Sequence, residues 1–212
     1  MSVFNLGNRR SIFNDNQVII GLTGPKGSGK DLACQLIQAK FGDNWERVAF
    51  ADPIKNTVAN LFHIGRDLEG PLKEEFRKQT LDTVKRLQSV SLVDNQTGER
   101  YGEFTGRDLI RDIGMLMRGY NCEQFNNYVR NEIANHKDRN FIITDVRFDN
   151  EVKLIRQIGG VIIEIHRPGY EYDGHVTESG TIKGDYHVFN NGTVESFESQ
   201  LDTVVSTILT DY

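Results

Sequence analysis

The stretch GPKGSGK, from Gly24 to Lys30, places glycines and a terminal lysine at the spacing G-x-x-x-x-G-K. Glycines permit a loop whose backbone N–H groups converge on phosphate oxygens, and the lysine ammonium reaches the same oxygens. The residues predicted to bind ATP are Gly24, Pro25, Lys26, Gly27, Ser28, Gly29, Lys30 and Asp31. A glycine loop can also simply join a strand to a helix, but the strand and helix expected on either side favour phosphate binding.

Asp31 follows the lysine at the position where this motif normally has a Ser or Thr hydroxyl that binds Mg²⁺. A carboxylate is also a hard oxygen ligand, so Asp31 can hold the metal directly or through water. It can instead hold a substrate hydroxyl, or act only as a helix-start acid stabilised by the helix dipole. The residues alone do not choose among these roles.

The stretch TDVRFDNE is the second one whose residue types could take part in binding or catalysis. Asp145 is expected at the carboxyl end of a buried strand, which is the edge where ligands bind in open α/β sheets, and it is a candidate second ligand of magnesium. Arg147 can neutralise charge on a transferred phosphoryl group, Glu151 can position that arginine, and Asp149 is an expected N-cap. A surface Arg–Glu pair of little energetic consequence is the alternative.

A third group lies on a helix expected over residues 105–120. Arg107, Arg111 and Gly114 share one side of this helix. Two guanidinium groups one turn apart can grip a monophosphate, and a glycine on that side lets a nucleotide approach closely. Ion pairs with Asp108 and Asp112 on a solvated face explain the same pattern equally well.

Two further stretches give weaker indications. Asp52 and Lys55 follow the second predicted strand at the same sheet edge, where helix capping and solvation explain much of their presence. The polar loop HRPGYEYDGHVTESG contains Arg167, His175 and Glu178 and has the size of a lid or a base-binding loop.

The elements that must position these residues alternate regularly between strands and helices. Short apolar runs predict strands at 17–24, 47–50, 140–147, 160–168 and 186–191. Helical spacing predicts helices at 30–41, 52–62, 105–120, 122–136, 149–158 and 193–209. The order strand, glycine loop, helix predicts an α/β fold, the three-layer P-loop NTPase fold, with an approximately five-stranded, mainly parallel sheet covered on both faces.

The chain is expected to form a single P-loop domain over residues 1–212, in which residues 1–16 form a flexible leader. Residues from about 65 to 106 are expected to form a helical acceptor-binding or lid insertion on the rim, with a charged helix at 71–88 and a hairpin or loop at 91–104. The helix at 105–120 is expected to bury Leu109, Ile113 and Leu116. The last helix is expected to bury Val194, Phe197, Leu201, Val204, Val205 and Ile208.

The composition excludes several classes of function. The 212 residues include 25 Lys and Arg against 30 Asp and Glu, and this net charge of -5 argues against broad nucleic-acid binding. No apolar run approaches the ~20 residues that span a bilayer, so no membrane partner is expected. Cys34, an expected core residue, and Cys122 lack the spacing of a disulfide framework or zinc site, and the five histidines show no metal-ligand spacing.

Together these motifs resemble one family, the deoxynucleoside monophosphate kinases of tailed bacteriophages, within the P-loop nucleoside monophosphate kinases. The resemblance extends from about Gly21 to Phe197 and is carried by GPKGSGKD, FADPIK, GRDLIRDIG, DVRFDNE and HRPGYEYDGHVTESG. The glycine loop alone indicates a superfamily, whereas its combination with DVRFDNE and HVTESG is much more selective. Residues from about His63 to Glu103 match the family poorly.

The resemblance implies roles for individual residues. Kinases of this kind also carry an acid after the loop lysine, so Asp31 looks like an active-site residue. The residues that match acceptor-binding or transfer positions of the family are Arg107, Gly114, Asp145, Arg147 and Glu151. Asp108, Arg111 and Met115 replace the Lys, Gln and Thr of some members, so base selectivity does not carry over.

The predicted reaction is direct in-line transfer of the γ-phosphoryl group of ATP to a deoxynucleoside monophosphate (dNMP), giving ADP and a deoxynucleoside diphosphate (dNDP), with Mg²⁺. The expected catalytic residues are Lys30, Asp31, Arg147 and Glu151. The expected dNMP-binding residues are Asp52, Lys55, Arg107, Arg111, Gly114, Asp145, Arg147 and Glu151, and the expected metal ligands are Asp31 and Asp145. The resemblance also implies a homodimer. The first 16 residues have neither the apolar region nor the cleavage-site pattern of an export signal, so a cytoplasmic location is expected, in the host cytoplasm for a phage-encoded chain.

Two other readings remain open from the sequence. One is a P-loop kinase for another small acceptor, such as dephospho-coenzyme A or a ribonucleotide, because the donor motif does not report the second substrate. The other is a nucleotide-binding protein without catalysis, which the missing loop hydroxyl suggests.

Overall fold

The computed structural model describes residues 17–61, 90–93, 100–104, 106–171 and 182–211. The chain divides into two compact units, one formed by Met1–Phe50 with Asn126–Tyr212 and the other by Ala51–Phe125. We call them the sheet unit and the second unit. Within the described ranges, no helix is both long and apolar enough to cross a membrane.

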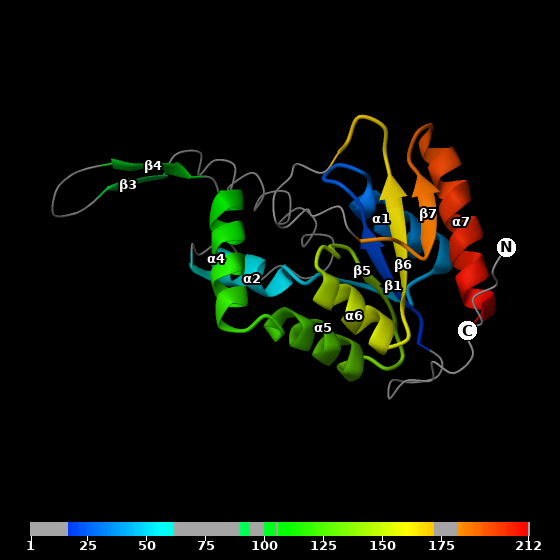
Figure 1. Ribbon diagram of the computed structural model, residues 1–212. Helices are drawn as coiled ribbons and strands as arrows, with labels where there is room; N and C mark the ends of the chain where they lie inside the picture. The colour runs from blue at the N-terminus through cyan, green and yellow to red at the C-terminus, as the bar shows by residue number, and fades with distance from the viewer. Residues whose placement is uncertain (1–16, 62–89, 94–99, 105, 172–181, 212) are drawn as a thin grey trace. The chain divides into compact units, whose positions relative to one another are not determined.

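A parallel β-sheet forms the centre of the sheet unit. Its strands are β1 (Ile19–Thr23), β2 (Trp45–Val48), β5 (Asn140–Ile143), β6 (Val161–His166) and β7 (Tyr186–Phe189). They pair in the order β2-β5-β1-β6-β7, and every neighbouring pair is parallel (Figure 1). The central strand β1 is entirely buried, as its aliphatic sequence predicts. The predicted five-stranded sheet is therefore confirmed.

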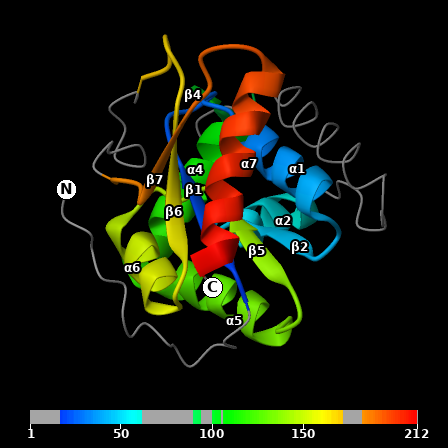
Figure 2. The same ribbon diagram turned by 90° about the vertical axis from the view of Figure 1, so that its right-hand side faces the viewer.

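Helices cover both faces of this sheet (Figure 2). One face packs against α1 (Lys30–Phe41) and α7 (Val194–Asp211), and α6 (Asp149–Gln157) covers the other. α5 (Gln124–Asn135) is tied to α6 by a hydrogen bond in which Asn126 Nδ2 donates to the Asn150 carbonyl oxygen at 3.1 Å. The layers thus match the predicted three-layer arrangement.

The core beneath α1 and α7 is close to the predicted one. Cys34 is buried in it, as expected, and in α7 the buried residues are Phe197, Leu201, Val205 and Ile208. Val204 is half-buried, whereas Val194 is 49% exposed and the prediction for it is wrong. Val194 is the first residue of α7, so the apolar stripe of this helix begins one turn later, at Phe197.

The second unit contains the helices α2 (Asp52–Leu61) and α4 (Gly106–Tyr120) and the strands β3 (Val90–Val93) and β4 (Arg100–Phe104). The two strands pair antiparallel, which confirms the predicted hairpin. The charged helix predicted at 71–88 lies outside the described residues. Residues 65–106 fall within this unit, and their assignment as an insertion stays a prediction.

The apolar face predicted for α4 is wrong in part. Leu116 is 61% exposed, Ile113 is half-buried, and Gly114 is buried instead. A Cβ atom added to Gly114 would lie 3.0 Å from Ile54 Cδ1, so α4 packs against α2 through its glycine. The absence of a side chain at Gly114 lets the two helices approach, which turns Leu116 away from this contact.

Candidate active site

The glycine loop lies where β1 ends and α1 begins. Gly24, Gly27 and Gly29 have φ angles of 142°, 79° and 109°, a region that residues with a Cβ rarely adopt. A Cβ atom at Gly24 would also lie 2.4 Å from the Ile165 carbonyl oxygen of β6. Both backbone conformation and space therefore require glycine at the start of this loop.

Two side chains from the neighbouring strand ends hold the outer side of the loop. Arg167 follows β6 and donates from Nη1 to the Gly27 carbonyl oxygen at 2.9 Å. Asn190 follows β7 and donates from Nδ2 to the Ser28 carbonyl oxygen at 2.9 Å. Because the C=O and N–H of one peptide point in opposite directions, the second bond directs the Gly29 N–H away from Asn190. The sequence offered no signal for the contact of Asn190.

The side chain of Lys30 folds back over the loop. Its Nζ donates to the carbonyl oxygens of Gly24 at 2.6 Å and of Pro25 at 2.7 Å. The ammonium charge is thus held at the loop, beside the first turn of α1, whose N–H groups have no carbonyl partner within the helix. Together these groups form the positive cradle that a phosphate group requires.

The hydroxyl of Ser28 supports the same interpretation. Ser28 is fully buried, and its Oγ finds no hydrogen-bond partner among the residues that the structure describes. A buried polar atom without a partner is costly unless a ligand or water satisfies it. Because Ser28 lies inside the glycine loop, the loop retains a hydrogen-bonding group for a bound molecule.

Asp31 and Asp145 supply carboxylates at this end of the sheet unit. Asp31 is exposed in the first turn of α1. Asp145 is half-buried just beyond β5, and its Oδ1 accepts the Phe50 N–H at 2.8 Å. The register pairs Gly21 with Ile143, so Asp145 comes level with Thr23, the residue before the loop.

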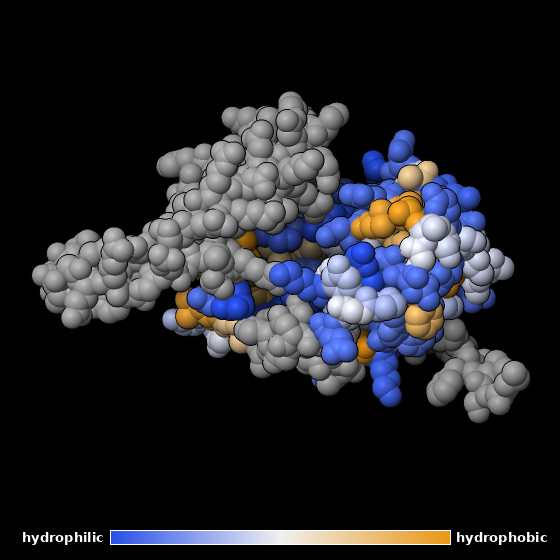
Figure 3. All heavy atoms as spheres, turned by 90° about the horizontal axis from the view of Figure 1, so that it is seen from above, coloured by the Kyte–Doolittle hydropathy of each residue, from blue (hydrophilic) through white to orange (hydrophobic). Residues whose placement is uncertain are grey.

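These carboxylates fit a magnesium ion by their chemistry. Mg²⁺ takes oxygen ligands, commonly one or two carboxylates together with phosphate oxygens and water. Asp31 directly follows the loop lysine, and Asp145 lies at the end of the strand adjacent to β1. The end of the sheet unit toward which the strands point is mostly hydrophilic (Figure 3), as a site for charged ligands requires.

The side chain of Glu151 accepts a hydrogen bond from the main-chain N–H of Arg147. Glu151 is 1% exposed, and its Oε2 accepts the N–H groups of Arg147 at 2.7 Å and of Phe148 at 3.1 Å. α6 begins at Asp149, so Phe148 occupies the N-cap position and the prediction for Asp149 is off by one residue. The carboxylate of Glu151 takes over the capping function, because Phe148 has no side-chain acceptor.

The other predicted acceptor residues lie in the second unit. Asp52 is the first residue of α2 and not its N-cap, since the Ala51 carbonyl oxygen accepts the Lys55 N–H at 3.1 Å. Lys55 Nζ lies 3.8 Å from Asp52 Oδ1, and Arg111 Nε lies 3.7 Å from Asp112 Oδ1. The Arg111–Asp112 pair is exposed and of the kind that contributes little stability, whereas in the other pair Lys55 is exposed and Asp52 is half-buried.

Gly114 is buried, and a Cβ atom added to it would lie 3.0 Å from Ile54 Cδ1. Its predicted role in acceptor binding stays a prediction. Arg107 belongs to α4, but its side chain lies outside the described residues, as do His175 and Glu178. The roles predicted for Arg107, Arg111, Asp52 and Lys55 stay predictions.

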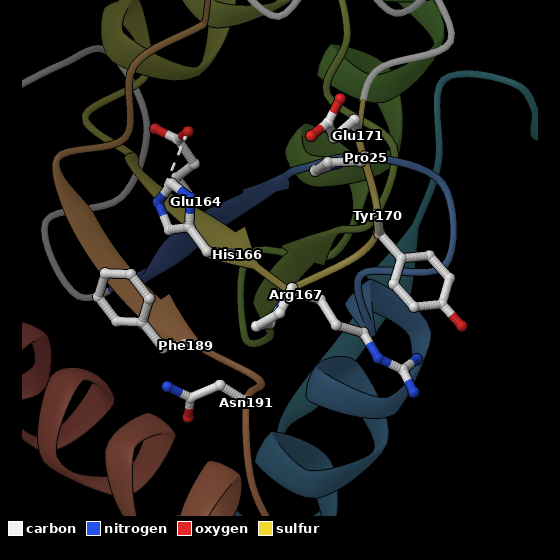
Figure 4. Close-up of a pocket in the computed structure, with 9 residues that line it drawn as sticks. Pro25, Glu164, His166, Arg167, Tyr170, Glu171, Phe189 and Asn191 are labelled. Atoms are coloured by element: carbon white, nitrogen blue, oxygen red, sulfur yellow. Dashed lines mark ion pairs between the residues drawn. The ribbon is translucent and has the colours of Figure 1, made fainter.

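A pocket of about 640 Å³ opens beside the glycine loop (Figure 4). Its lining residues are Pro25, Glu164, His166, Arg167, Pro168, Tyr170, Glu171, Phe189 and Asn191. Figure 4 shows two groups around it, with Arg167 and Tyr170 on one side and Glu164, His166 and Phe189 on the other. The Arg167 guanidinium lies 4.4 Å from the centre of the Tyr170 ring, and His166 stacks on Phe189 with ring centres 4.9 Å apart.

Comparison with known proteins finds a family model and relatives that share one family name. The sequence model of the deoxynucleotide monophosphate kinase family matches residues 100–201. A protein of Acanthamoeba polyphaga mimivirus, provisionally named a deoxynucleotide monophosphate kinase, is 32% identical over 197 residues, covering 89% of this chain and 96% of the relative. The deoxynucleotide monophosphate kinase of Escherichia phage RB69 is 24% identical over 243 residues, covering 88% of this chain and 99% of the relative.

Solved structures show weaker likeness. Dephospho-CoA kinase from Campylobacter jejuni has a TM-score of 0.45 and 11% identity, with coverage of 92% of this chain and 98% of that one. Mycobacterium tuberculosis APS kinase CysC has a TM-score of 0.39 and 9% identity, with coverage of 93% and 99%. Neither likeness carries an argument about activity. The glycine loop, the sheet order and the mimivirus relative together show that the chain belongs to the deoxynucleotide monophosphate kinase family and is a nucleotide kinase with the P-loop NTPase fold.

Proposed function

We propose that the protein transfers the γ-phosphoryl group of ATP to a dNMP, producing ADP and a dNDP in a Mg²⁺-dependent reaction. The observation that carries the proposal is the glycine loop with the Lys30 ammonium held over it, in a chain of this family. Such a loop binds the phosphates of a nucleoside triphosphate. The donor is therefore the better supported of the two substrates.

Lys30 and the first-turn N–H groups of α1 are assigned to the donor phosphates. When phosphate oxygens enter the loop, they compete with the Gly24 and Pro25 carbonyls for the donors of Lys30. Arg167 and Asn190 keep the loop carbonyls engaged on its other side. Phosphoryl transfer depends on positioning and charge neutralisation, and a loop held in advance supplies both.

Asp31 and Asp145 would hold the magnesium ion. When bound, the ion neutralises the charge of the phosphate oxygens. Asp145 is anchored for this role, because its Oδ1 already accepts the Phe50 N–H and its orientation is thereby fixed. Asp31 is exposed at the helix start and can reach the metal directly or through water.

Arg147 is assigned to the transferred phosphoryl group or the acceptor phosphate. Glu151 acts as a positioning residue, since its buried carboxylate accepts the main-chain N–H of Arg147 at 2.7 Å. On the acceptor side, Arg107 and Arg111 are assigned to the monophosphate by their one-turn spacing, and Asp52 and Lys55 to acceptor placement. A homodimer remains a prediction.

The pocket beside Pro25 is assigned to the nucleoside part of the donor. It adjoins the loop, and its Arg167–Tyr170 side offers a guanidinium and an aromatic ring against which a base can stack. Its volume of about 640 Å³ lies within the range of small-molecule sites. Substitution of Tyr170 would therefore weaken ATP binding, both by removing the ring from the pocket and by removing its packing against Gly27 of the loop.

An acceptor panel tests the proposed reaction. The full-length protein is incubated with ATP, Mg²⁺ and, separately, each dNMP, each ribonucleotide and dephospho-coenzyme A, and the products are separated by chromatography. We expect a dNDP from at least one dNMP. If product forms only with a ribonucleotide or dephospho-coenzyme A, the proposed dNMP acceptor is wrong. If ATP binds and no product forms with any acceptor, the proposed transfer reaction is wrong.

A further inference from the structure

A cluster of metal-ligating side chains lies on β6 and β7, apart from the glycine loop. Glu164 and His166 are two residues apart on β6, so their side chains share one face of the sheet. The parallel register places His187 of β7 opposite Glu164 and Phe189 opposite His166. Three potential ligands thus meet on one face, although His187 is 21 residues from His166 in sequence.

The side chains of the three residues lie close enough to bind a single ion, with one ligand atom from each residue within 4.8 Å of the others. His166 Nε2 and His187 Nδ1 lie 3.0 Å apart, and Glu164 approaches each of them at 3.6 Å, through Oε1 and Oε2 respectively. Metal–nitrogen and metal–oxygen bonds of about 2.0–2.2 Å in a tetrahedral site put neighbouring ligand atoms about 3.3–3.5 Å apart. The three separations bracket this value, so small side-chain rotations bring all three atoms to one ion.

The surroundings of the cluster hold the ligands in place. Glu164 Oε2 accepts the Gly184 N–H at 3.0 Å, and its side chain is only 15% exposed. The His166 ring is stacked between His187 and Phe189, with ring centres 5.2 and 4.9 Å away. The imidazoles of His166 and His187 are 36% and 49% exposed, and His166 and Glu164 line the open pocket, which leaves a path for an ion and a position for water.

We propose that Glu164, His166 and His187 form a binding site for one divalent transition-metal ion such as Zn²⁺. Two imidazole nitrogens and one carboxylate, with a fourth position open to water, are a ligand set that suits Zn²⁺, Co²⁺ or Ni²⁺. Mg²⁺ prefers oxygen ligands and is not expected to compete. The site is chemically distinct from the carboxylates Asp31 and Asp145 assigned to magnesium.

A metal titration tests the site directly. Full-length protein freed of metal with a chelator is titrated with CoCl₂ while d–d absorption is recorded, and ZnCl₂ is then measured by competition with a chromogenic chelator. We expect one equivalent per chain, no displacement by millimolar Mg²⁺, and a loss of affinity on the order of 100-fold in His166→Gln and His187→Gln. His136→Gln is the matched control, because His136 is an exposed histidine outside the cluster.

Melting of the same proteins provides a second readout. Zn²⁺ at a concentration about a hundredfold above its dissociation constant is expected to raise the melting temperature of the wild type by about 5–10 °C. The His187→Gln variant should lose this shift and His136→Gln should keep it. Equal affinity in wild type and both cluster variants would overturn the proposal, and so would an equal loss in His136→Gln.

A measurement on the wild type alone covers the case in which a variant fails to fold. Histidines are modified with diethyl pyrocarbonate with and without Zn²⁺, and the modified peptides are quantified by mass spectrometry. We expect Zn²⁺ to protect His166 and His187 and to leave His136 unprotected. Unchanged modification of His166 and His187 would mean that their 3.0 Å contact is a direct hydrogen bond between two rings, and the metal site would be excluded.

Discussion

At the scale of single residues, the chemistry of the candidate site depends on which groups can meet phosphate and which serve the main chain. Lys30 is bound to two carbonyl oxygens of its own loop, so its ammonium is fixed at the phosphate cradle. Glu151, by contrast, is buried and bound to two main-chain N–H groups. Charged side chains near the site therefore differ in use, since Lys30 is available to phosphate and Glu151 serves the main chain.

Substitution of Asp31 tests whether its carboxylate takes the place of the usual hydroxyl. If Asp31 holds the metal, Asp31→Ala should raise the Mg²⁺ concentration needed for half-maximal rate, because one oxygen ligand is lost. Asp31→Ser should partly restore it by supplying a hydroxyl. The measurement is the initial rate of dNDP formation across a Mg²⁺ series. Identical Mg²⁺ dependence in all three proteins would leave Asp31 as a helix-start acid only.

Substitution of Glu151 tests whether its carboxylate caps the start of α6 and thereby stabilises the fold. Glu151→Ala leaves two N–H groups without their acceptor, and we expect it to lower the free energy of unfolding by about 1–3 kcal/mol. Glu151→Gln keeps an acceptor oxygen and should cost less. Urea denaturation measures both, with Lys153→Ala as the control because Lys153 is exposed on the same helix. An unfolding free energy unchanged in Glu151→Ala would contradict the capping assignment.

At the scale of elements, the loop between β1 and α1 depends on the strand ends beside it. Gly24 packs against the Ile165 carbonyl of β6, and Arg167 and Asn190 bind the loop carbonyls from the ends of β6 and β7. The conformation of the glycine loop thus depends on contacts with residues of β6 and with residues that follow β6 and β7. Its glycine spacing is readable in the sequence, whereas its supports come from residues about 140 and 162 positions away.

A pair of glycine substitutions isolates this packing. Gly24 and Gly42 both have positive φ, but only Gly24 would bring a Cβ into contact, since nothing lies within 4 Å of a Cβ at Gly42. Gly42 has φ 90° and ψ -177°, a region essentially restricted to glycine, so Gly42→Ala should cost about 1–3 kcal/mol of conformational strain. Gly24→Ala should cost the same kind of strain and, in addition, about 1–3 kcal/mol from overpacking against β6. Denaturant unfolding measures the free energy of unfolding of both variants. Equal destabilisation of the two variants would mean that the contact with β6 is not limiting.

Sequence reasoning succeeded where a local pattern decides the outcome and failed where distant segments meet. The strands, the hairpin and the glycine loop follow from apolar runs, turn residues and glycine spacing, and the structure agrees with them. The burial of Gly114 against Ile54 could not be predicted, because it depends on how two helices pack. Similarly, Glu164, His166 and His187 meet only through the register of β6 and β7.

At the scale of the whole molecule, the sheet unit and the second unit both contain residues that are predicted to bind substrates. The glycine loop, Asp145 and Arg147 belong to the sheet unit, whereas Arg107, Arg111, Asp52 and Lys55 belong to the second. The predicted donor groups thus belong to the sheet unit, whereas predicted acceptor groups occur in each of the two units. Binding of the donor alone should therefore act on the sheet unit.

ATP is expected to stabilise the protein through this unit. A ligand that binds only the folded state at about a hundredfold its dissociation constant adds about 2.7 kcal/mol, or about 5–10 °C in melting temperature for a chain of this size. Differential scanning fluorimetry with ATP and Mg²⁺ measures the shift. Tyr170→Ala should reduce it, because the pocket beside the loop loses its aromatic side. An unchanged shift in Tyr170→Ala would place the base elsewhere.

The most direct measurement follows the γ-phosphate itself. Wild type, Lys30→Ala and Lys40→Ala are mixed with γ-labelled ATP, Mg²⁺ and a dNMP in a single turnover, and label is traced by chromatography and in the protein. Lys40 is the control because it is exposed in the last turn of α1. We predict label in the dNDP for wild type and Lys40→Ala, none on the protein, and a rate lower by on the order of 100-fold or more in Lys30→Ala. Label released as free phosphate, bound to the protein, or transferred as fast by Lys30→Ala would contradict direct transfer from ATP held in the glycine loop.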